Sequence, residues 1–533
     1  MGLLDEIKNY NDLAVEAKER IERVYLDDDR PWVVGYSGGK DSTTALQLII
    51  ETLVLMKNKN IKLNKKIYVI SSDTMVETPL IISSIANNLE QIQRFVDDNH
   101  LPVETHLVRP SIDNTFWVNL IGKGYPAPNQ SFRWCTDRMK IEPTNQFIKN
   151  KVSDYGEVIV VLGVRLGEST SRDRVLKKHD IRGKEIMQHS TLANAFTFAP
   201  IKYFDVDDVW NYLLNNKSPW GANNEELFKL YSDSNSNECP LIIDKETKER
   251  TGSCGNSRFG CWVCTVVSED KALTGFVENG ENWLKPLLKY RNDLTKNRDN
   301  RSMRMKRRSN GSVYTISVKE KLVQGERTLI IPKKSGREKV TITVKKNSSL
   351  KASNDDIYTV IESKDLRNYI RHNRIDLDDG EIPNLLIHDE FDHYNMLGLG
   401  PYTFKARAKM LADLLKLQKE VNDAGHKVQL ISDDELREIR RQWLKRGLIE
   451  DSVSKIYSAV YNKDLVCEKN DIELISSSQY EILKEICDEQ DVYADPLIKM
   501  LNLEKDNTGS RVKKNVLEQI NEILNEDYLH MQE

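Results

Sequence analysis

The chain has 533 residues, which is too many for one ordinary hydrophobic core and predicts two or three domains. Hydrophobic residues make up 39% of it and charged residues 30%, and no apolar run approaches the roughly 20 residues that span a bilayer. The N-terminus is charged and amphipathic, without the apolar core of a signal peptide, so we expect a cytoplasmic protein with no membrane partner. The net charge of −4 gives no global sign of nucleic-acid binding. Residues 285–308, however, hold ten Lys or Arg against two Asp, which predicts a solvated face, a mobile linker or a contact with a nucleic-acid phosphate backbone.

The first predicted helix covers residues 1–28, and the stretch PWVVGYSGGKDSTT at residues 31–44 follows it. Its order of apolar strand, glycine-rich turn and helix start predicts an anion site, because unpaired N–H groups and the positive end of the helix dipole meet there. A Walker A loop needs four residues between its first glycine and the Gly-Lys pair. Here three residues separate Gly35 from Gly39, and Asp41 follows Lys40, so a different phosphate loop is indicated.

Strands and helices then alternate, which predicts a doubly wound α/β fold with a parallel sheet. Strands are expected at residues 66–70, 103–108 and 157–162, a helix at 80–98, a connector at 198–201 and a capped helix at 205–213. Ligands bind at the carboxyl ends of the strands of such sheets. The SGGKDS turn, the segment 73–77, and Arg165 and Arg172 all follow predicted strands, so one shared site is expected.

The turn SGGKDS at residues 37–42 resembles the PP-loop of the ATP pyrophosphatases, and the fold that this implies is the adenine nucleotide alpha hydrolase-like sheet. The order of this turn, DTMVET at 73–78, a cysteine segment around 135 and GVRLGES at 163–169 resembles the phosphoadenosine phosphosulfate reductase branch, over about residues 30–215. The resemblance implies ATP binding by Ser37, Gly38, Gly39, Lys40, Asp41, Ser42, Asp73, Glu77, Arg133 and Arg165. Mg²⁺ would be held by Asp41 or Asp73, and Lys140 is a further candidate for phosphate contact.

The chain has seven cysteines, an odd number and a low density for its length, which argues against a secreted disulfide framework. Four of them, Cys239, Cys254, Cys261 and Cys264, fall within 26 residues and end in a CxxC pair. Four thiolates suit either a tetrahedral zinc ion or a [4Fe–4S] cluster, and their spacing does not separate the two. Cys467 and Cys487 are isolated and are expected to be packed thiols.

Four segments together resemble the DndC family, the sulfurtransferases of bacterial DNA phosphorothioation. They are PWVVGYSGGKDST, FRWCTDRMKIEPTNQFI, PWGANNEELFKLY and SCGNSRFGCWVCTVV, and the likeness extends through about residue 295 and more weakly to 398–402. It implies a [4Fe–4S] cluster on the four cysteines, DNA as substrate, and a cysteine desulfurase, DndD and DndE as partners. The implied reaction adenylates a backbone phosphate, releasing pyrophosphate, and replaces a non-bridging oxygen with sulfur.

Within this resemblance Lys40, Asp41, Cys135 and Arg165 are the catalytic candidates. Either Cys135, as a persulfide, or the cluster would carry the sulfur, and Arg133 and Arg138 are expected to favour the Cys135 thiolate. Three other functions stay open: tRNA thiolation, sulfonucleotide handling, and a nucleotide-dependent DNA-binding scaffold. Sulfonucleotide reduction is disfavoured because no cysteine occurs in the last 46 residues.

The predicted domain plan has five parts. It comprises an N-terminal helix (1–28), a PP-loop domain (29–220), an iron-sulfur cysteine subdomain (221–295), a basic linker with a small β insert (296–400) and a helical region (401–533). The insert is predicted from alternating β-branched runs at 312–318, 328–332 and 340–344, and is expected to be antiparallel. Amphipathic helices are predicted at 404–420, 433–448, 479–487 and 512–524.

Overall fold

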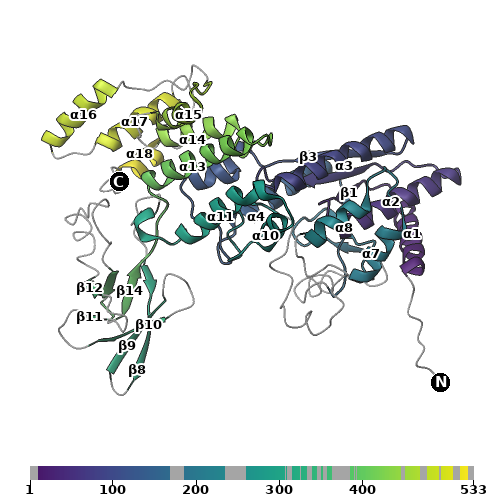
Figure 1. Cartoon of the computed structure of the whole chain (residues 1–533), viewed down its shortest axis with the longest axis horizontal. Helices are drawn as coiled ribbons and strands as arrows, with labels where there is room; N and C mark the ends of the chain where they lie inside the picture. The colour runs from purple at the N-terminus through teal and green to yellow at the C-terminus, as the bar shows by residue number, and fades with distance from the viewer. Residues whose placement is uncertain are drawn as a thin grey trace. The chain divides into compact units, whose positions relative to one another are not determined.

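The protein is described here from a computed structural model, whose chain forms two compact units (Figure 1). The first unit is Met1–Phe116 with Pro128–Asn292, and the second is Trp117–Ala127 with Asp293–Glu533. The residues that the structure describes are 10–167, 185–233, 260–305, 308, 315–323, 326–332, 339–344, 350–351, 357–362, 384–388, 390–391, 393–445, 451–467, 477–490, 494–507 and 516–525.

The first unit is built on a six-stranded sheet with the order β3-β2-β1-β4-β6-β5. The strands are β1 (Trp32–Gly35), β2 (Ile67–Ser72), β3 (Val103–Val108), β4 (Val158–Val161), β5 (Ile186–Gln188) and β6 (Ala195–Phe198). Every neighbouring pair is parallel except β5 with β6, which confirms the predicted parallel, doubly wound sheet. The connector expected at 198–201 starts one residue late, because Phe198 still pairs in β6.

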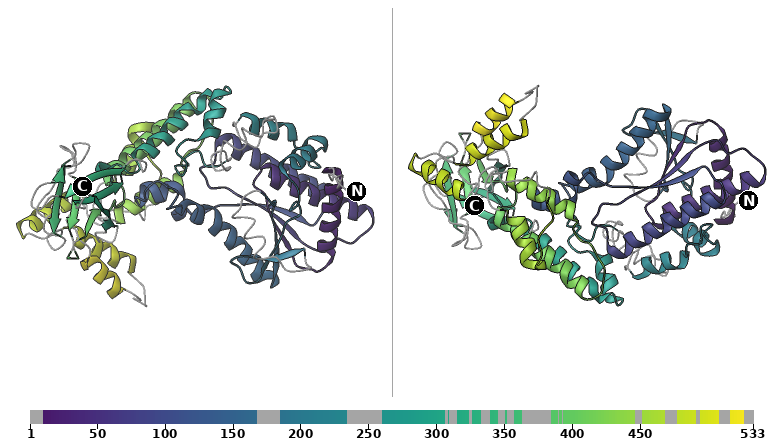
Figure 2. Two further views of the ribbon diagram at one scale, coloured as in Figure 1. Left: turned by 90° about the horizontal axis from the view of Figure 1, so that it is seen from below. Right: turned by 90° about the horizontal axis from the view of Figure 1, so that it is seen from above.

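Helices lie on both faces of this sheet, as Figure 2 shows. The α-helices described in the first unit are α1 (Tyr10–Leu26), α2 (Lys40–Asn58), α3 (Pro79–Asp98), α4 (Trp134–Thr136), α5 (Glu142–Tyr155), α7 (Val206–Asn215), α8 (Asn224–Asp233), α10 (Lys271–Glu278) and α11 (Lys285–Asn297), the last of which continues past Asn292, where this unit ends. Ile148 of α5 packs with Val33 of β1, whereas the neighbouring Trp32 meets Tyr25 of α1 with ring centroids 5.6 Å apart. Since successive strand residues point to opposite faces, α1 and α5 cover different sides of the sheet.

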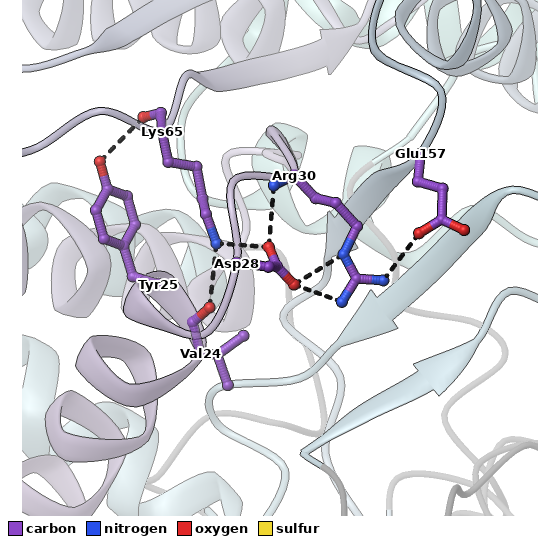
Figure 3. A network of polar contacts seen from close by, with 6 residues as sticks. All are labelled: Val24, Tyr25, Asp28, Arg30, Lys65 and Glu157. Atoms are coloured by element: carbon purple, nitrogen blue, oxygen red, sulfur yellow. Dashed lines mark hydrogen bonds and ion pairs between the residues drawn. The ribbon is translucent and has the colours of Figure 1, made fainter.

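A charged network ties together the starts of three strands (Figure 3). Asp28 accepts hydrogen bonds from Nε of Arg30 at 2.8 Å and from Nζ of Lys65 at 3.0 Å. Arg30 reaches Glu157 just before β4 at 3.3 Å, and Lys65, which precedes β2, also donates to the carbonyl of Val24 at 3.1 Å. The network therefore fixes the end of the sheet opposite to the strand carboxyl ends.

Asp28→Ala is expected to lower the free energy of unfolding by about 3 kcal/mol, because it leaves the buried Lys65 ammonium without its carboxylate. Burial raises the pKa of Asp28, but the hydrogen bonds from Arg30 and Lys65 outweigh it and lower the pKa overall. A group with a lowered folded pKa stabilises the fold above its unfolded pKa, so this contribution is lost as the pH falls below about 4. Urea unfolding at pH 7 and pH 3 measures both effects.

The matched control is Asp27→Ala, since Asp27 is a neighbouring, exposed carboxylate. It should change the unfolding free energy by less than about 0.5 kcal/mol. Equal losses for the two variants at pH 7, or a loss for Asp28→Ala that does not shrink in acid, would contradict the role given to Asp28.

Two further sheets lie in the described part of the second unit. An antiparallel sheet β10-β9-β8 is formed by β8 (Lys319–Val323), β9 (Glu326–Pro332) and β10 (Lys339–Val344). A five-stranded sheet β11-β12-β13-β14-β7 is formed by β7 (Thr315–Ser317), β11 (Leu350–Lys351), β12 (Ile357–Glu362), β13 (Asn384–His388) and β14 (Tyr394–Leu397). The runs 328–332 and 340–344 pair as predicted, but the run 312–318 supplies β7, which pairs with β14 in the other sheet.

The described residues from 404 onward are mainly helical, which confirms the predicted helical C-terminal region. They are α13 (Phe404–Asp423), α14 (Asp433–Lys445), α15 (Ser452–Tyr461), α16 (Ser477–Glu489), α17 (Ala494–Asn507) and α18 (Val516–Asn525). Cys487 is buried in α16, as expected, whereas Cys467 is half-buried. Among the described helices, none combines the length and apolar character needed to cross a bilayer.

The segment 117–127 interrupts the first unit in sequence but belongs to the second unit. It contains a π-helical turn, Val118–Gly122, whose apolar side chains are fully buried. Indole Nε1 of Trp117 donates to the carbonyl of Leu430 at 2.7 Å, and indole Nε1 of Trp443 donates to that of Ile121 at 2.9 Å. Nothing in the local periodicity of this segment predicts the arrangement.

Candidate functional site

The phosphate loop joins β1 to α2 at the carboxyl edge of the sheet. The hydroxyl of Ser42 donates to the carbonyl of Gly39 at 2.9 Å and accepts the backbone N–H of Ser37 at 3.2 Å, which closes the turn. Gly38 has φ +71°, a left-handed conformation that favours glycine. Helix α2 begins at Lys40, so the N–H groups of its first turn face the loop, as an anion site requires.

Asp41 lies between two cations at this edge. Its Oδ2 is 3.0 Å from Nζ of Lys40 and its Oδ1 accepts from Nε of Arg165 at 2.6 Å. Lys40 and Arg165 are both buried, with 2% and 3% of their surface exposed. The structure thus brings together three of the four residues predicted to be catalytic.

Gly163 permits this arrangement because β4 ends directly beside the first turn of α2. A Cβ atom added to Gly163 would lie 2.6 Å from the carbonyl oxygen of Asp41 and 2.9 Å from the Cα of Ser42. β1 pairs with β2 on one side and with β4 on the other, so this contact lies where the strand order reverses. That position is the usual ligand crevice of open α/β sheets.

Asp73 follows β2 at the same edge. Its Oδ1 accepts the backbone N–H of Met75 at 2.8 Å, and its Oδ2 accepts from Nε of Arg109 at 2.8 Å. Carboxylates such as those of Asp41 and Asp73 have the oxygen chemistry that Mg²⁺ prefers. Arg109 did not stand out in the sequence, because it lies beyond the short motifs.

Glu77 faces the cysteine segment. Its Oε1 accepts the hydroxyl of Thr74 at 2.9 Å and lies 3.5 Å from Nζ of Lys140. Its backbone forms an isolated antiparallel bridge with Cys261, and the hydroxyl of Thr74 is 3.3 Å from the sulfur of Cys261. The strand-end segment 73–78 therefore links the nucleotide edge of the sheet to the CxxC pair.

The CxxC pair forms a tight turn, in which the N–H of Cys264 donates to the carbonyl of Cys261 at 3.0 Å. Both thiols are half-buried. The other two predicted ligands, Cys239 and Cys254, lie outside the described residues, as do Glu168, Ser169 and Arg172. Within the described ranges, no three His, Cys, Asp or Glu side chains are grouped so as to hold a metal ion. The described pair has the donor chemistry of half a four-cysteine centre.

Cys135 lies in the short helix α4 and is electrostatically coupled to Cys264. Burial first, and then the charge of Cys264, raise the pKa of the Cys135 thiol, while Lys140 acts against the rise. The expected lowering by Arg133 and Arg138 is therefore wrong: Arg133 is exposed, and Arg138 donates to the side-chain oxygen of Asn114 at 3.2 Å.

The phosphate contact of Lys140 stays a prediction, and its Nζ lies 3.5 Å from Oε1 of Glu77. The negative charge of Cys261, followed by that of Glu77, raises the pKa of Lys140 despite the opposing effect of burial. Burial raises the pKa of the Cys261 thiol, and the charge of Glu77 adds to the rise. Lys140 is thus a cation within electrostatic range of Cys261 and Cys135.

The basic run 285–308 is partly structural. Arg291 is fully buried and donates to the carbonyls of Cys264 at 2.8 Å, Ser268 at 2.9 Å and Val267. In the second unit, Arg304 is buried and donates to the carbonyl of Gly400 at 2.7 Å. The exposed positive charges of the described part of the run are Lys285, Lys289, Lys296 and Arg308.

Tyr231 is a residue of this site that sequence reasoning missed. Its hydroxyl lies 3.3 Å from the backbone nitrogen of Lys40 and accepts that N–H. The segment PWGANNEELFKLY contains this tyrosine, but no local signal connects it to a loop nearly two hundred residues earlier.

Comparisons with known proteins agree with this architecture. The model of the phosphoadenosine phosphosulfate reductase domain matches residues 31–267. An uncharacterized protein of Methanocaldococcus jannaschii is 25% identical over 303 residues, 54% of this chain and 50% of the relative. A second from the same organism is 24% identical over 288 residues, 51% of this chain and 64% of the relative. The chain therefore spans half the length of the first and less than two thirds of the second.

Two solved structures share low overall similarity with the chain. One is the phosphoadenylyl-sulfate reductase from Candida auris in a phosphate complex, 14% identical, with a TM-score of 0.27, covering 43% of this chain and 92% of that chain. The other is the U34-tRNA thiolase NcsA from Methanococcus maripaludis with its [4Fe-4S] cluster, 15% identical, with a TM-score of 0.25, covering 46% and 83%. Residues 31–267, which include the parallel sheet and the SGGKDS loop, are thus similar to the phosphoadenosine phosphosulfate reductase domain.

Proposed function

We propose that the protein is an ATP-dependent sulfurtransferase that modifies the DNA backbone with phosphorothioate. The observation that favours this function is that the nucleotide edge of the sheet and the CxxC pair are joined by one short segment of the chain. The strand-end segment 73–78 has Asp73 at the nucleotide edge, while its Thr74 lies 3.3 Å from the sulfur of Cys261. An enzyme that couples ATP cleavage to sulfur delivery needs this proximity.

The reaction proceeds in two displacements. A non-bridging oxygen of the DNA phosphate attacks the α-phosphorus of ATP, the bond to the β-phosphate oxygen breaks, and pyrophosphate leaves. A sulfide, or the outer sulfur of a persulfide, then attacks the DNA phosphorus, and AMP leaves with the original oxygen. In the persulfide case a second thiol attacks the cysteine sulfur, so that a disulfide forms as the S–S bond to the phosphorothioate breaks. Adenylation is needed because the unmodified phosphate oxygen is a poor leaving group.

The residues of the chain have distinct tasks in these steps. Lys40 and the first-turn N–H groups of α2 stabilise charge that develops on the departing pyrophosphate. Arg165 orients Asp41 through its 2.6 Å contact and adds positive charge beside the nucleotide. Lys140 favours anionic sulfur at Cys135 and Cys261.

Sulfur is held either by Cys135 as a persulfide or at the cysteine centre to which Cys261 and Cys264 belong. Cys239 and Cys254 would complete that centre with two more thiolates. A [4Fe–4S] cluster, when bound there, supplies iron that binds inorganic sulfide. A cysteine desulfurase is the proposed sulfur source, and DndD and DndE are the proposed assembly partners.

The test supplies the anaerobically purified chain with ATP, a cysteine desulfurase, isotopically labelled cysteine, and duplex DNA or tRNA. DndD and DndE are added in a parallel reaction. We expect pyrophosphate release and labelled phosphorothioate dinucleotides in the DNA digest, with both signals absent in Lys40→Met. Iron and sulfide analysis of the same samples should give about four of each per chain, decreasing in Cys261→Ala.

Other results would identify a different function. Label in tRNA nucleosides instead of DNA would indicate tRNA thiolation. Nucleotide and DNA binding without pyrophosphate release would indicate a scaffold. One zinc per chain without visible absorption would make the cysteine centre structural and leave Cys135 as the sulfur carrier.

A further inference from the structure

Tyr231 occupies a position over the phosphate loop that the proposed chemistry does not use. It belongs to α8, is 9% exposed, and its hydroxyl oxygen accepts the backbone N–H of Lys40 at 3.3 Å. Nζ of Lys40 lies 5.4 Å from the centre of the tyrosine ring. The same residue therefore contacts both the backbone donor and the side-chain cation of Lys40.

The backbone N–H of Lys40 is one of the groups expected to donate a hydrogen bond to a bound phosphate. Lys40 is the first residue of α2, and N–H groups in the first turn of a helix have no acceptor within the helix. Such groups bind phosphate oxygens where a loop opens onto a helix N-terminus. A neutral phenol oxygen is a weaker acceptor than a phosphate oxygen, so a nucleotide phosphate would displace it.

We propose that Tyr231 is a displaceable cap of the phosphate loop, whose hydroxyl holds the Lys40 N–H until a phosphate of a nucleoside triphosphate replaces it. This inference rests on the nucleotide binding in the proposed function. Tyr231 acts as a positioning residue: its hydroxyl competes with phosphate for the Lys40 N–H and so sets how tightly phosphate binds.

Aromatic packing helps to keep the ring in place. Trp210 of α7 lies edge-on to Tyr231, with centroids 5.1 Å apart, and also contacts Phe228 at 5.3 Å. The last residue of α8, Asp233, accepts at its carbonyl from the side-chain amide of Asn279 at 2.8 Å, just after α10. These contacts hold the ring and the end of α8 in place.

The test uses Tyr231→Phe, which keeps the ring and removes only the hydroxyl. Calorimetry with inorganic pyrophosphate and with an ATP analogue that resists cleavage between the α and β phosphates should give dissociation constants about three- to tenfold lower than in the wild type. The control is Tyr212→Phe on α7, where the lost hydroxyl contacts Glu51 at 2.8 Å; its affinity should equal the wild type's.

Hydrogen exchange separates a cap from a purely structural tyrosine. In ligand-free Tyr231→Phe, the peptide containing the Lys40 amide should exchange faster than in the wild type, and saturating ligand should remove the difference. Equal or weaker binding by Tyr231→Phe, with a wild type that binds both ligands, overturns the cap alone. A wild type that binds neither ligand overturns the proposed nucleotide chemistry and the cap with it.

Discussion

Gly163→Ala is expected to slow pyrophosphate release from ATP at least about a hundredfold while the protein remains folded. The added methyl group would lie 2.6 Å from the carbonyl oxygen of Asp41. Its nearest neighbours are all backbone atoms of Asp41 and Ser42, so no flexible side chain can move aside. Either the end of β4 or the first turn of α2 must move. Both movements separate Arg165 from Asp41, now joined at 2.6 Å, and displacements of about 1 Å in an active site commonly cost this much.

The measurement is pyrophosphate release at saturating ATP, with thermal unfolding recorded on the same samples. Overpacking should lower stability by only about 1 to 3 kcal/mol, which a folded protein can tolerate. Gly122→Ala is the control, because its added carbon would meet its neighbours at 3.5 Å, an ordinary contact distance. A Gly163→Ala enzyme with the wild-type rate would show that this close approach is unimportant for catalysis.

Arg291→Met is expected to lower the free energy of unfolding of the first unit by about 3 to 5 kcal/mol. The guanidinium group is fully buried and satisfies the carbonyls of Cys264, Val267 and Ser268. Methionine fills similar space but leaves these acceptors without their donor. The turn containing the CxxC pair should show the largest increase in hydrogen exchange, since the carbonyls in and after it lose their hydrogen bonds from Arg291.

Urea unfolding gives the total loss, and hydrogen exchange of the peptide covering 260–268 gives its location. Lys289→Met is the matched control, because Lys289 lies exposed on the same helix. Arg291→Lys should fall between the wild type and Arg291→Met, since an ammonium cannot reach three carbonyls in a fork. A loss in Arg291→Met no larger than in Lys289→Met would contradict a structural role for Arg291.

The sequence was sufficient to predict the parallel sheet and the proximity of Lys40, Asp41 and Arg165. Parallel strands place their carboxyl ends at one edge of the sheet, so residues that follow the strands lie close together. Local patterns were sufficient there: an apolar strand, a glycine turn and a helix start define the loop without knowledge of the rest. The roles of Glu77 and Lys140 could not be predicted in this way. Both depend on which distant segment packs against them, and the bridge between Glu77 and Cys261 joins residues far apart in the chain.

The same limit explains the remaining differences. Neighbouring arginines suggested an activated thiol at Cys135, but burial has the larger effect on its pKa, and burial is a property of the assembled fold. Tyr231 reaches Lys40 only once α8 is in position. The charge count of 285–308 suggested a solvated or DNA-facing surface, whereas Arg291 and Arg304 are used internally.

The membership of 117–127 in the second unit has a consequence for how the protein is made. The chain crosses between its two units three times, so the ribosome releases Trp117 and Ile121 long before Leu430 and Trp443 exist to cover them. Until then this apolar segment emerges as a loop of the nascent first unit, and it is a ready target for a chaperone. A gene cut after residue 292 would leave it permanently exposed, and the two halves of the protein would have to be expressed together.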